Sequence, residues 1–176
     1  MVRIRDARRD DAAALVEIYR PHVERSAASF ELQTPSVAEF EDRIVKALGS
    51  WAWLVAENYR GPVGYAYATS HRAREAYRWS VETSAYVHAD HHGQGVGKRL
   101  YRELLPLLAG KGYCTAYAGV TLPNDASVAL HRSVGFTPVG VFRRAGWKFE
   151  RWHDVSWWQL SLREAPLVEP APSASS

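Results

Sequence analysis

Apolar residues recur along the chain at two spacings, and these spacings predict a succession of strands and helices. Alternating or continuous apolar runs predict strands at 2–5, 51–56, 63–68, 81–87, 114–120, 136–142 and 154–162. Spacings of three and four residues predict helices that begin near Asp10 or Asp11, at Pro35–Ser36, at Val96 and at Ser127. We expect Pro21 to bend or end the first helix, Gly49 to stop the second and Pro106 to kink the third. This order of elements argues for a mixed α/β sheet with flanking helices.

Polar connectors separate these elements, and three of them stand out. The segment 26–34 is polar with Phe30 embedded in it, which predicts a loop at the mouth of a ligand site. The segment 70–79 is basic and aromatic, and a further loop is expected around 146–153, between the last two strands. The segment 58–61 predicts the turn of a hairpin between the second and third strands.

Length and composition indicate one globular domain. The chain has 176 residues, 47% hydrophobic and 23% charged, so we place a single domain at 2–163 and a disordered Pro/Ala/Ser-rich tail at 164–176. The N-terminus has no signal-peptide core and no apolar run could span a bilayer, so a cytoplasmic location is expected. The single cysteine, Cys114, excludes an internal disulfide and a multi-cysteine metal site. Four of the seven tryptophans crowd the C-terminal quarter and predict a large apolar interface or pocket there: Trp147, Trp152, Trp157 and Trp158.

The most informative stretch joins the strand that ends at Val87 to the helix that starts at Val96. Gly93, Gly95 and Gly97 alternate there, and free N–H groups at a helix start form an anion site that suits a pyrophosphate. The spacing is not the Gly-x-x-x-x-Gly-Lys-Ser/Thr of a P-loop, nor the Gly-x-Gly-x-x-Gly of a dinucleotide fold. A glycine-rich turn without a ligand is the alternative. The net charge of +3 suits an anionic cofactor, but it would also suit nucleic acid and so does not distinguish the two.

Two motifs resemble those of the GNAT N-acetyltransferases. The run from His92 to Gly97 is similar to their acetyl-CoA loop, with His92 where Gln or Arg is usual, and 124–136 is similar to their second motif. The segments 78–87, 119–124 and 146–160 look like the phosphinothricin/methionine sulfoximine acetyltransferase branch, and the resemblance covers about residues 2–162. Two further departures are Glu150, where a small residue is usual, and Trp147, where Tyr, Phe or Gln is common.

The resemblance implies a GNAT-type acyl-CoA N-acyltransferase fold, which is a mixed, mostly antiparallel α/β fold with a central splayed sheet. It also implies acetyl-CoA as co-substrate and no metal. Amides of the strand 85–87, splayed by a bulge, would stabilise the thioester oxygen, and amides of 93–98 would bind the pyrophosphate. Asn124 would bond the pantetheine arm, and a helix N-cap is compatible with that role. The implied cofactor-binding residues are Ala85, Tyr86, Val87, Gly93, Gln94, Gly95, Val96, Gly97, Lys98, Asn124 and Ser133.

Two residues are candidates for proton transfer. An ammonium at neutral pH cannot attack a thioester, so an acceptor amine needs a base. Glu82 matches the family's base and is flanked by the apolar Val81 and Ala85; a surface glutamate on an edge strand is the alternative. His131 stands where many GNAT enzymes carry a tyrosine that reprotonates the leaving thiolate; a histidine that only packs there is the alternative.

A basic and aromatic set is expected to bind the acceptor. It consists of Phe30, Arg72, Ala73, Arg74 and Tyr77, together with Glu82. Arginine offers a planar fork to a carboxylate or phosphinate, whereas a solvated basic loop is the alternative. Lys148, His153 and Asp154 look like the family's C-terminal signature, for which we favour a structural role over a pocket across a dimer interface. The histidines at 88, 91 and 92 lack the spacing of a zinc site.

The function predicted is acetyl-CoA-dependent acetylation of the α-amino group of a small amino-acid analogue. The acceptor class is phosphinothricin or methionine sulfoximine/sulfone, with direct transfer and Glu82 as general base. The alternatives are another amine (a protein N-terminus, a polyamine or an aminoglycoside) or an acetyl-CoA-binding module without turnover. No nucleic-acid or membrane partner is expected, and a homodimer is implied by the resemblance.

Overall fold

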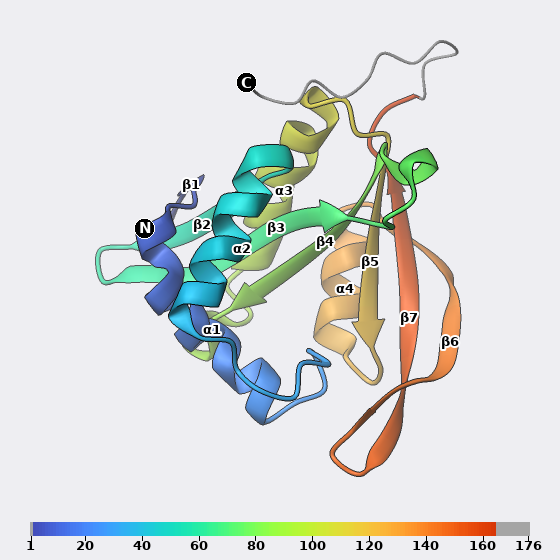
Figure 1. The fold of residues 1–176 in the computed structure, drawn as a ribbon, viewed down its shortest axis with the longest axis horizontal. Coiled ribbons are helices and arrows are strands. Elements are labelled where there is room, and N and C mark those ends of the chain that lie inside the picture. Colours follow the sequence, from blue (N-terminus) through green and yellow to red (C-terminus); the bar gives the residue numbers. More distant parts are fainter. Residues whose placement is uncertain (1, 165–176) are drawn as a thin grey trace.

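The computed structural model describes residues 2–164, which form a seven-stranded sheet between two layers of helices (Figure 1). The strands are β1 (Arg3–Asp6), β2 (Trp53–Asn58), β3 (Gly61–Ser70), β4 (Ser80–Val87), β5 (Thr115–Thr121), β6 (Thr137–Lys148) and β7 (Arg151–Ser161). The helices are α1 (Ala12–Glu24), α2 (Val37–Ser50), α3 (Val96–Gly110) and α4 (Asp125–Ser133), with short 3-10 turns η1 (Arg9–Asp11), η2 (Glu75–Tyr77) and η3 (Ala89–His91). The expected mixed α/β class is confirmed, and the tail expected at 164–176 lies outside the described residues except for Glu164.

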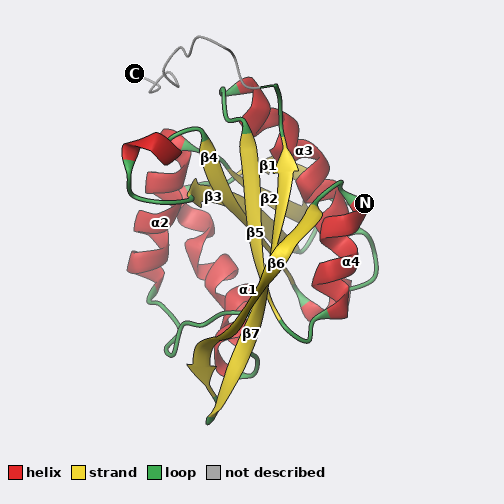
Figure 2. Cartoon of the chain, turned by 90° about the vertical axis from the view of Figure 1, so that its right-hand side faces the viewer, coloured by secondary structure: helices red, strands yellow, loops and turns green. Residues whose placement is uncertain are grey.

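The sheet has the order β1-β2-β3-β4-β5-β7-β6, and all neighbours are antiparallel except β4 and β5. The helices α1 and α2 cover one face with a core that includes Leu15 and Phe40, and α3 and α4 cover the other face with Leu100 and Leu104 (Figure 2). Each helix buries an apolar stripe against the sheet, which stabilises both layers. Within residues 2–164, no helix is long and apolar enough to cross a membrane.

The helix ends follow the predicted signals in part. Ser36 caps α2, because its hydroxyl accepts the Glu39 N–H while the Glu39 carboxylate accepts the Ser36 N–H. The α2 helix continues one residue past Gly49, and α1 continues past Pro21 to Glu24. Pro21 stands in the last turns of α1, where Val23 is buried, so packing outweighs the lost backbone hydrogen bond.

The prediction of a loop at 146–153 is wrong, because these residues form the tip of a long hairpin. The β6 strand extends to Lys148 and β7 begins at Arg151, with cross-strand pairs such as Trp147 with Trp152. The turn residues Phe149 and Glu150 have φ of 51° and 57°. A left-handed conformation favours glycine, which explains why a small residue is usual at 150.

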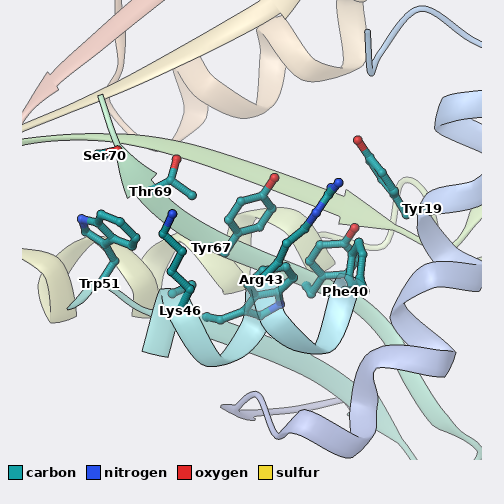
Figure 3. Close-up of a pocket in the computed structure, with 11 residues that line it drawn as sticks. Tyr19, Phe40, Arg43, Lys46, Trp51, Tyr67, Thr69 and Ser70 are labelled. Carbon is teal, nitrogen blue, oxygen red and sulfur yellow. The ribbon is translucent and has the colours of Figure 1, made fainter. Parts of the chain in front are cut away.

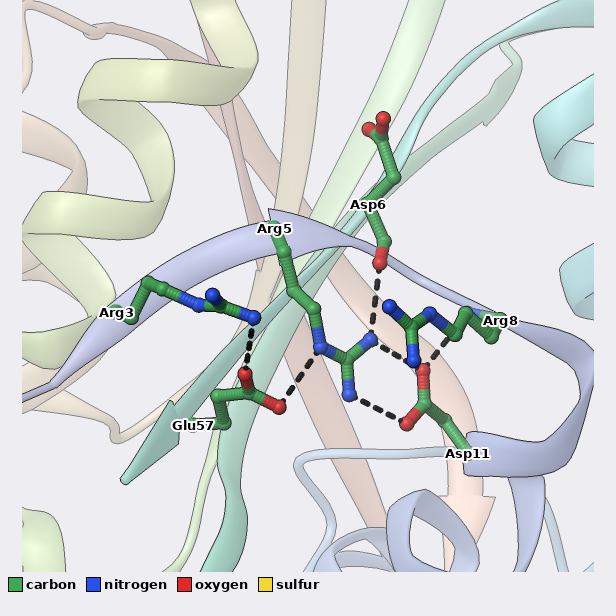
Figure 4. Close-up of polar contacts among 6 residues, drawn as sticks. All are labelled: Arg3, Arg5, Asp6, Arg8, Asp11 and Glu57. Carbon is green, nitrogen blue, oxygen red and sulfur yellow. Dashed lines mark hydrogen bonds and ion pairs between the residues drawn. The ribbon is translucent and has the colours of Figure 1, made fainter. Parts of the chain in front are cut away.

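An ion-pair cluster joins the N-terminal strand to the start of the first helix (Figure 4). Both terminal nitrogens of Arg5 donate to Asp11 at 2.7 Å, and Arg5 Nε donates to Glu57 at 2.7 Å. Asp11 also accepts the Arg8 N–H at 2.7 Å. The Asp11 carboxylate therefore caps the start of η1 and makes no side-chain cap on α1, although α1 begins directly after Asp11, as the sequence predicts.

Candidate functional site

The candidate site begins where two neighbouring strands separate. The parallel strands β4 and β5 pair only over Ser80–Glu82 and Thr115–Tyr117, and Figure 1 shows them diverging beyond these residues. On its other side β4 stays paired with β3 as far as Val87, in continuous register. The predicted splay is present and arises from this divergence, and the pairing of β4 with β3 shows no bulge at 85–87. Because the strand edge past Glu82 faces the gap, alternate amides of β4 point into it without a strand partner.

A cavity of about 310 Å³ opens at this divergence. Its lining combines the loop before α2 with the strands β4, β5, β6 and β7: Ala28, Ser29, Phe30, Glu82, Thr83, Ser84, Tyr86, Gly119, Thr121, Phe142, Ala145, Val155 and Trp157. The fold thus brings together Glu82, Phe30 and Tyr86 from the predicted set. The cavity is the right size for a small acceptor and its acetyl donor group.

Glu82 has a partner that the sequence did not reveal. His71 Nδ1 donates to Glu82 Oε1 at 2.9 Å, and the imidazole stacks on Tyr117 with ring centroids 4.3 Å apart. The side chain of Glu82 is 34% exposed and that of His71 is 11% exposed. Residue 71 follows β3 directly, and the register of Ser70 with Val81 brings it back beside residue 82. The contact between His71 and Glu82 depends on the antiparallel pairing of β3 with β4, so a local sequence motif could not predict it.

The loop that carries Phe30 is clamped by the long hairpin. Lys148 is buried, and its ammonium donates to the carbonyls of Val23, Ser26 and Ser29 at 2.6, 3.0 and 2.7 Å. Burial lowers the pKa of Lys148, while the three carbonyls satisfy its donors. A Cβ at Gly146 would collide with the Phe30 ring, so that glycine admits the aromatic side chain.

The other members of the C-terminal signature are also tied to the backbone. His153 is buried and its Nε2 donates to the carbonyl of Lys148 at 2.9 Å. Asp154 accepts the N–H of Arg144 at 2.7 Å, where Arg144 has φ of 51°. These contacts agree with the structural role favoured from sequence. They hold the hairpin that forms one wall of the cavity.

The glycine loop has the geometry of an anion cradle. Gly93 and Gly95 have φ of 73° and 74°, and a Cβ on either would meet nothing within 4 Å. Gly95 is the N-cap of α3 and offers no side-chain cap, so the first-turn amides, which include Lys98, face outward from the helix start. The departure at His92 has a structural use, since its Nε2 donates to the carbonyl of Val87 at 2.8 Å and closes the loop. This arrangement fits a pyrophosphate.

Gly97 and Gln94 contribute to the packing and the rigidity of the glycine loop. A Cβ at Gly97 would lie 3.0 Å from a methyl carbon of Leu130, so glycine allows α3 to pack closely on α4. The Gln94 amide donates to the carbonyl of Asp90 at 2.8 Å and stiffens the turn. Val96 is buried beneath them.

On α4, two predicted cofactor residues are engaged with their own helix. Asn124 is the N-cap and accepts the N–H of Ser127 at 3.0 Å, as the capping alternative requires. Ser133 is exposed and donates to the carbonyl of Leu130 at 2.8 Å. Asn124 and Ser133 lie at opposite ends of α4.

His131 is buried and both of its ring nitrogens have partners. Nδ1 donates to the carbonyl of Ser127 at 2.7 Å, and Nε2 lies 3.1 Å from the hydroxyl of Tyr101. Burial lowers the pKa of His131, so the ring is neutral at neutral pH. The Tyr101 hydroxyl also donates to Thr83 Oγ1 at 3.3 Å, so it connects the buried imidazole to β4. This geometry favours the packing alternative over a proton donor.

The predicted acceptor-binding residues of the basic segment 70–79 lie outside the lining of the Glu82 cavity. Arg72, Ala73, Arg74 and Tyr77 are exposed and are not among the residues that line the cavity. Tyr77 connects the segment to the site, since its ring centroid lies 5.7 Å from that of His71. Between residues 2 and 164, no cluster of three or more His, Cys, Asp or Glu side chains could hold a metal ion.

Comparison with known proteins assigns this geometry to a family. A family model described as an acetyltransferase (GNAT) domain matches residues 4–157. The phosphinothricin N-acetyltransferase of Streptomyces viridochromogenes is 39% identical over 158 residues, which cover 90% of this chain and 86% of that protein. The L-methionine sulfoximine/L-methionine sulfone acetyltransferase of Salmonella typhimurium is 34% identical, with 92% and 95% covered.

A solved structure agrees with the fold. The crystal structure of a phosphinothricin acetyltransferase from Sinorhizobium meliloti in complex with AcCoA superposes with a TM-score of 0.91 at 35% identity, covering 98% of this chain and 95% of that chain. The GNAT resemblance and the GNAT-type fold expected from the sequence are thereby confirmed.

Proposed function

The chain belongs to the GNAT acetyltransferases and is an acetyl-CoA-dependent N-acetyltransferase, and we propose that its acceptor is the α-amino group of a small amino-acid analogue. The acceptor class we propose is phosphinothricin or methionine sulfoximine/sulfone. The observation that carries the proposal is the placement of Glu82 in the cavity between β4 and β5, with His71 on its outer oxygen. The names of the relatives support the acceptor class.

In the proposed mechanism, Glu82 takes the proton that the acceptor ammonium must lose. His71 holds the carboxylate by its Nδ1–H, so the remaining oxygen is left to face the amine. The neutral amine then attacks the acetyl carbonyl carbon; a C–N bond forms, the C–S bond breaks and the thiolate leaves. The proton that the attacking nitrogen loses after the attack passes to the thiolate, which gives the amide and the free thiol. Amides on the free edge of β4, in the segment 85–87, would donate to the carbonyl oxygen as it gains negative charge.

The residues that would hold acetyl-CoA are those of the glycine loop and the gap beside it. Amides from Gly93 to Lys98 would bind the pyrophosphate at the start of α3, because this helix has no side-chain cap to compete. The pantetheine arm would follow the divergence between β4 and β5, with Asn124 nearby at the start of α4. A contact of Ser133 with the cofactor is also part of the proposal. For His131 we propose packing at the interface of helix and cofactor, the alternative to reprotonation of the leaving thiolate.

The acidic group of the acceptor is proposed to meet the basic connector. Arg72 and Arg74 lie at the rim, on the segment that Tyr77 anchors against His71. A guanidinium binds a carboxylate or phosphinate through two parallel hydrogen bonds. The same positive rim disfavours polyamines and aminoglycosides, the alternative acceptors. We further propose a single domain at 2–163, a homodimer and a cytoplasmic location.

Thiol release with a panel of amines tests this proposal. Acetyl-CoA should yield free thiol with phosphinothricin or methionine sulfoximine, and Glu82→Gln should lower kcat by roughly 10²- to 10⁴-fold because a positioned base contributes that much. Glu103→Gln, which changes an exposed glutamate of α3, is the matched control and should keep full activity. Release with no α-amino acid analogue, or an unchanged rate in Glu82→Gln with folding intact, would refute it.

A further inference from the structure

A second cavity, of about 270 Å³, lies between α2 and the strands β2 and β3 (Figure 3). Its lining residues are Tyr19, Phe40, Arg43, Lys46, Ala47, Trp51, Trp53, Tyr65, Tyr67, Thr69 and Ser70. None of them lines the Glu82 cavity, so the two spaces are distinct. The mechanism proposed above uses none of these side chains.

The floor of this cavity contains an unpaired buried donor. Trp53 is 2% exposed, and its Nε1 has no hydrogen-bond partner among the described residues. The indole is fixed by stacking on Tyr67 at 4.3 Å and Tyr65 at 5.4 Å between ring centroids. A buried N–H without an acceptor is destabilising, so Trp53 is held here by the packing of its ring beside the cavity.

The open side of the cavity is positively charged. Arg43 and Lys46 point from α2 toward the rings and hydroxyls of β3 (Figure 3). Arg43 donates to both oxygens of Glu31, at 2.5 and 3.2 Å. Lys46 makes no ion pair within the described part of the chain, and no acidic side chain is among the lining residues. An anion is therefore the charge that this rim favours.

The two features together define a ligand chemistry. The walls are largely apolar, and the partly exposed rings of Trp51 and Tyr67 offer surface to an occupant. A ligand that fits must have a flat apolar body and an acidic end, so that the acidic end meets the Lys46 ammonium while the body lies against the aromatic rings.

We propose that this cavity is a second ligand site, which takes a small aromatic carboxylate. The carboxylate pairs with Lys46 at the rim, and the aromatic body lies over the rings beneath α2. The site neighbours the catalytic strand, because Thr69 of this cavity pairs across the sheet with Glu82 and Tyr67 pairs with Ser84. Its occupant would thus be one strand away from the proposed base.

The two cavities each contain an unpaired indole N–H, Trp53 in one and Trp157 in the other, which makes a selective test possible. The full-length protein labelled with ¹⁵N is titrated with 3-phenylpropionate, and its indole N–H signals are followed, with Trp53→Phe and Trp157→Phe spectra for assignment. The proposal predicts a saturable shift of the Trp53 signal while the Trp157 signal stays in place. The neutral isostere 3-phenylpropanamide should bind more weakly.

Two variants complete the test. Lys46→Gln should weaken binding of 3-phenylpropionate by about tenfold, since a charge-assisted hydrogen bond is lost. Arg102→Gln removes one exposed cation from α3 on the opposite face and should bind like the unmodified protein. A Trp53 signal that never shifts, a shift confined to Trp157, or equal affinity in Lys46→Gln would each overturn the proposal.

Discussion

At the residue scale, the proposed chemistry depends on Glu82 and on its partner His71. Glu82 could be proposed from its match to a family motif, but His71 could not, because its role depends on the return of the chain from β3 to β4. The structural roles of His92 and Glu150 could not be predicted from the sequence either. His92 donates a hydrogen bond to the carbonyl of Val87 and closes the glycine loop, and Glu150 adopts a left-handed backbone conformation in the hairpin turn. Sequence motifs predicted the candidate site, whereas contacts between distant segments determine its geometry.

His71 should behave as a positioning residue for Glu82. Replacement by phenylalanine keeps the stacking on Tyr117 but removes the donor, so kcat/KM should fall by roughly 10- to 100-fold, the range for a hydrogen bond to a charged group. His71→Gln retains a donor and should recover part of the rate; equal rates in both variants and the unmodified enzyme would contradict this role.

At the scale of elements, the order of strands and helices follows from apolar spacing alone. The hairpin tip was mistaken for a loop because its strand residues are large, polar and aromatic, such as Trp147, Lys148 and Trp152, with little β-branched content. Those side chains are explained only by tertiary contacts: Lys148 binds three carbonyls of another loop. Likewise, Pro21 remains inside α1 because neighbouring residues are buried.

The clamp made by Lys148 should be important for both stability and acceptor binding. Lys148→Met leaves three backbone carbonyls without their donor, which should lower the free energy of unfolding by about 2–4 kcal/mol. The KM for the acceptor should rise, because the loop with Phe30 loses its anchor. Urea denaturation and steady-state kinetics measure the two effects, and Lys111→Met, at the end of α3, is the control. Unchanged values in Lys148→Met would show that the clamp is dispensable.

At the scale of the whole molecule, two partly or fully buried histidines should set a pH dependence of stability. Burial lowers the pKa of His131 and of His22 below the ordinary value of 6.5, and for His22 the nearby His92 adds to the effect. The unfolded chain therefore binds more protons than the folded chain between those lowered values and about 6.5. Stability should fall as pH drops below about 6.5 and level off below the folded-state values.

Thermal unfolding between pH 7.5 and 5 measures this effect. His131→Asn should flatten the decline, although it lowers stability at pH 7.5 by removing the contact with Tyr101. A variant at the exposed His88, His88→Gln, serves as the control for a surface histidine. A melting temperature that does not decline below pH 6.5, or the same decline in His131→Asn, would contradict the assignment.

The exposed edge of the sheet favours the proposed homodimer. Large apolar side chains are exposed on β6 and at the start of β7: Val139, Val141, Phe142, Trp147 and Trp152. Patches of this kind mark interaction surfaces. Changing Trp147 and Trp152 together to serine should convert a dimer to a monomer in sedimentation, while Tyr59→Ser, at the opposite edge, should not. A monomeric unmodified protein would refute the homodimer.

The proposed mechanism requires that the amides of the glycine loop and the carboxylate of Glu82 serve one site at the gap between β4 and β5. The most direct measurement is a crystal structure of the protein with CoA bound. We predict the diphosphate within hydrogen-bond distance of the amides from Gly93 to Lys98, and the sulfur in the gap beside Glu82. A diphosphate bound elsewhere, or a Glu82 carboxylate turned away from the sulfur into solvent, would contradict the account.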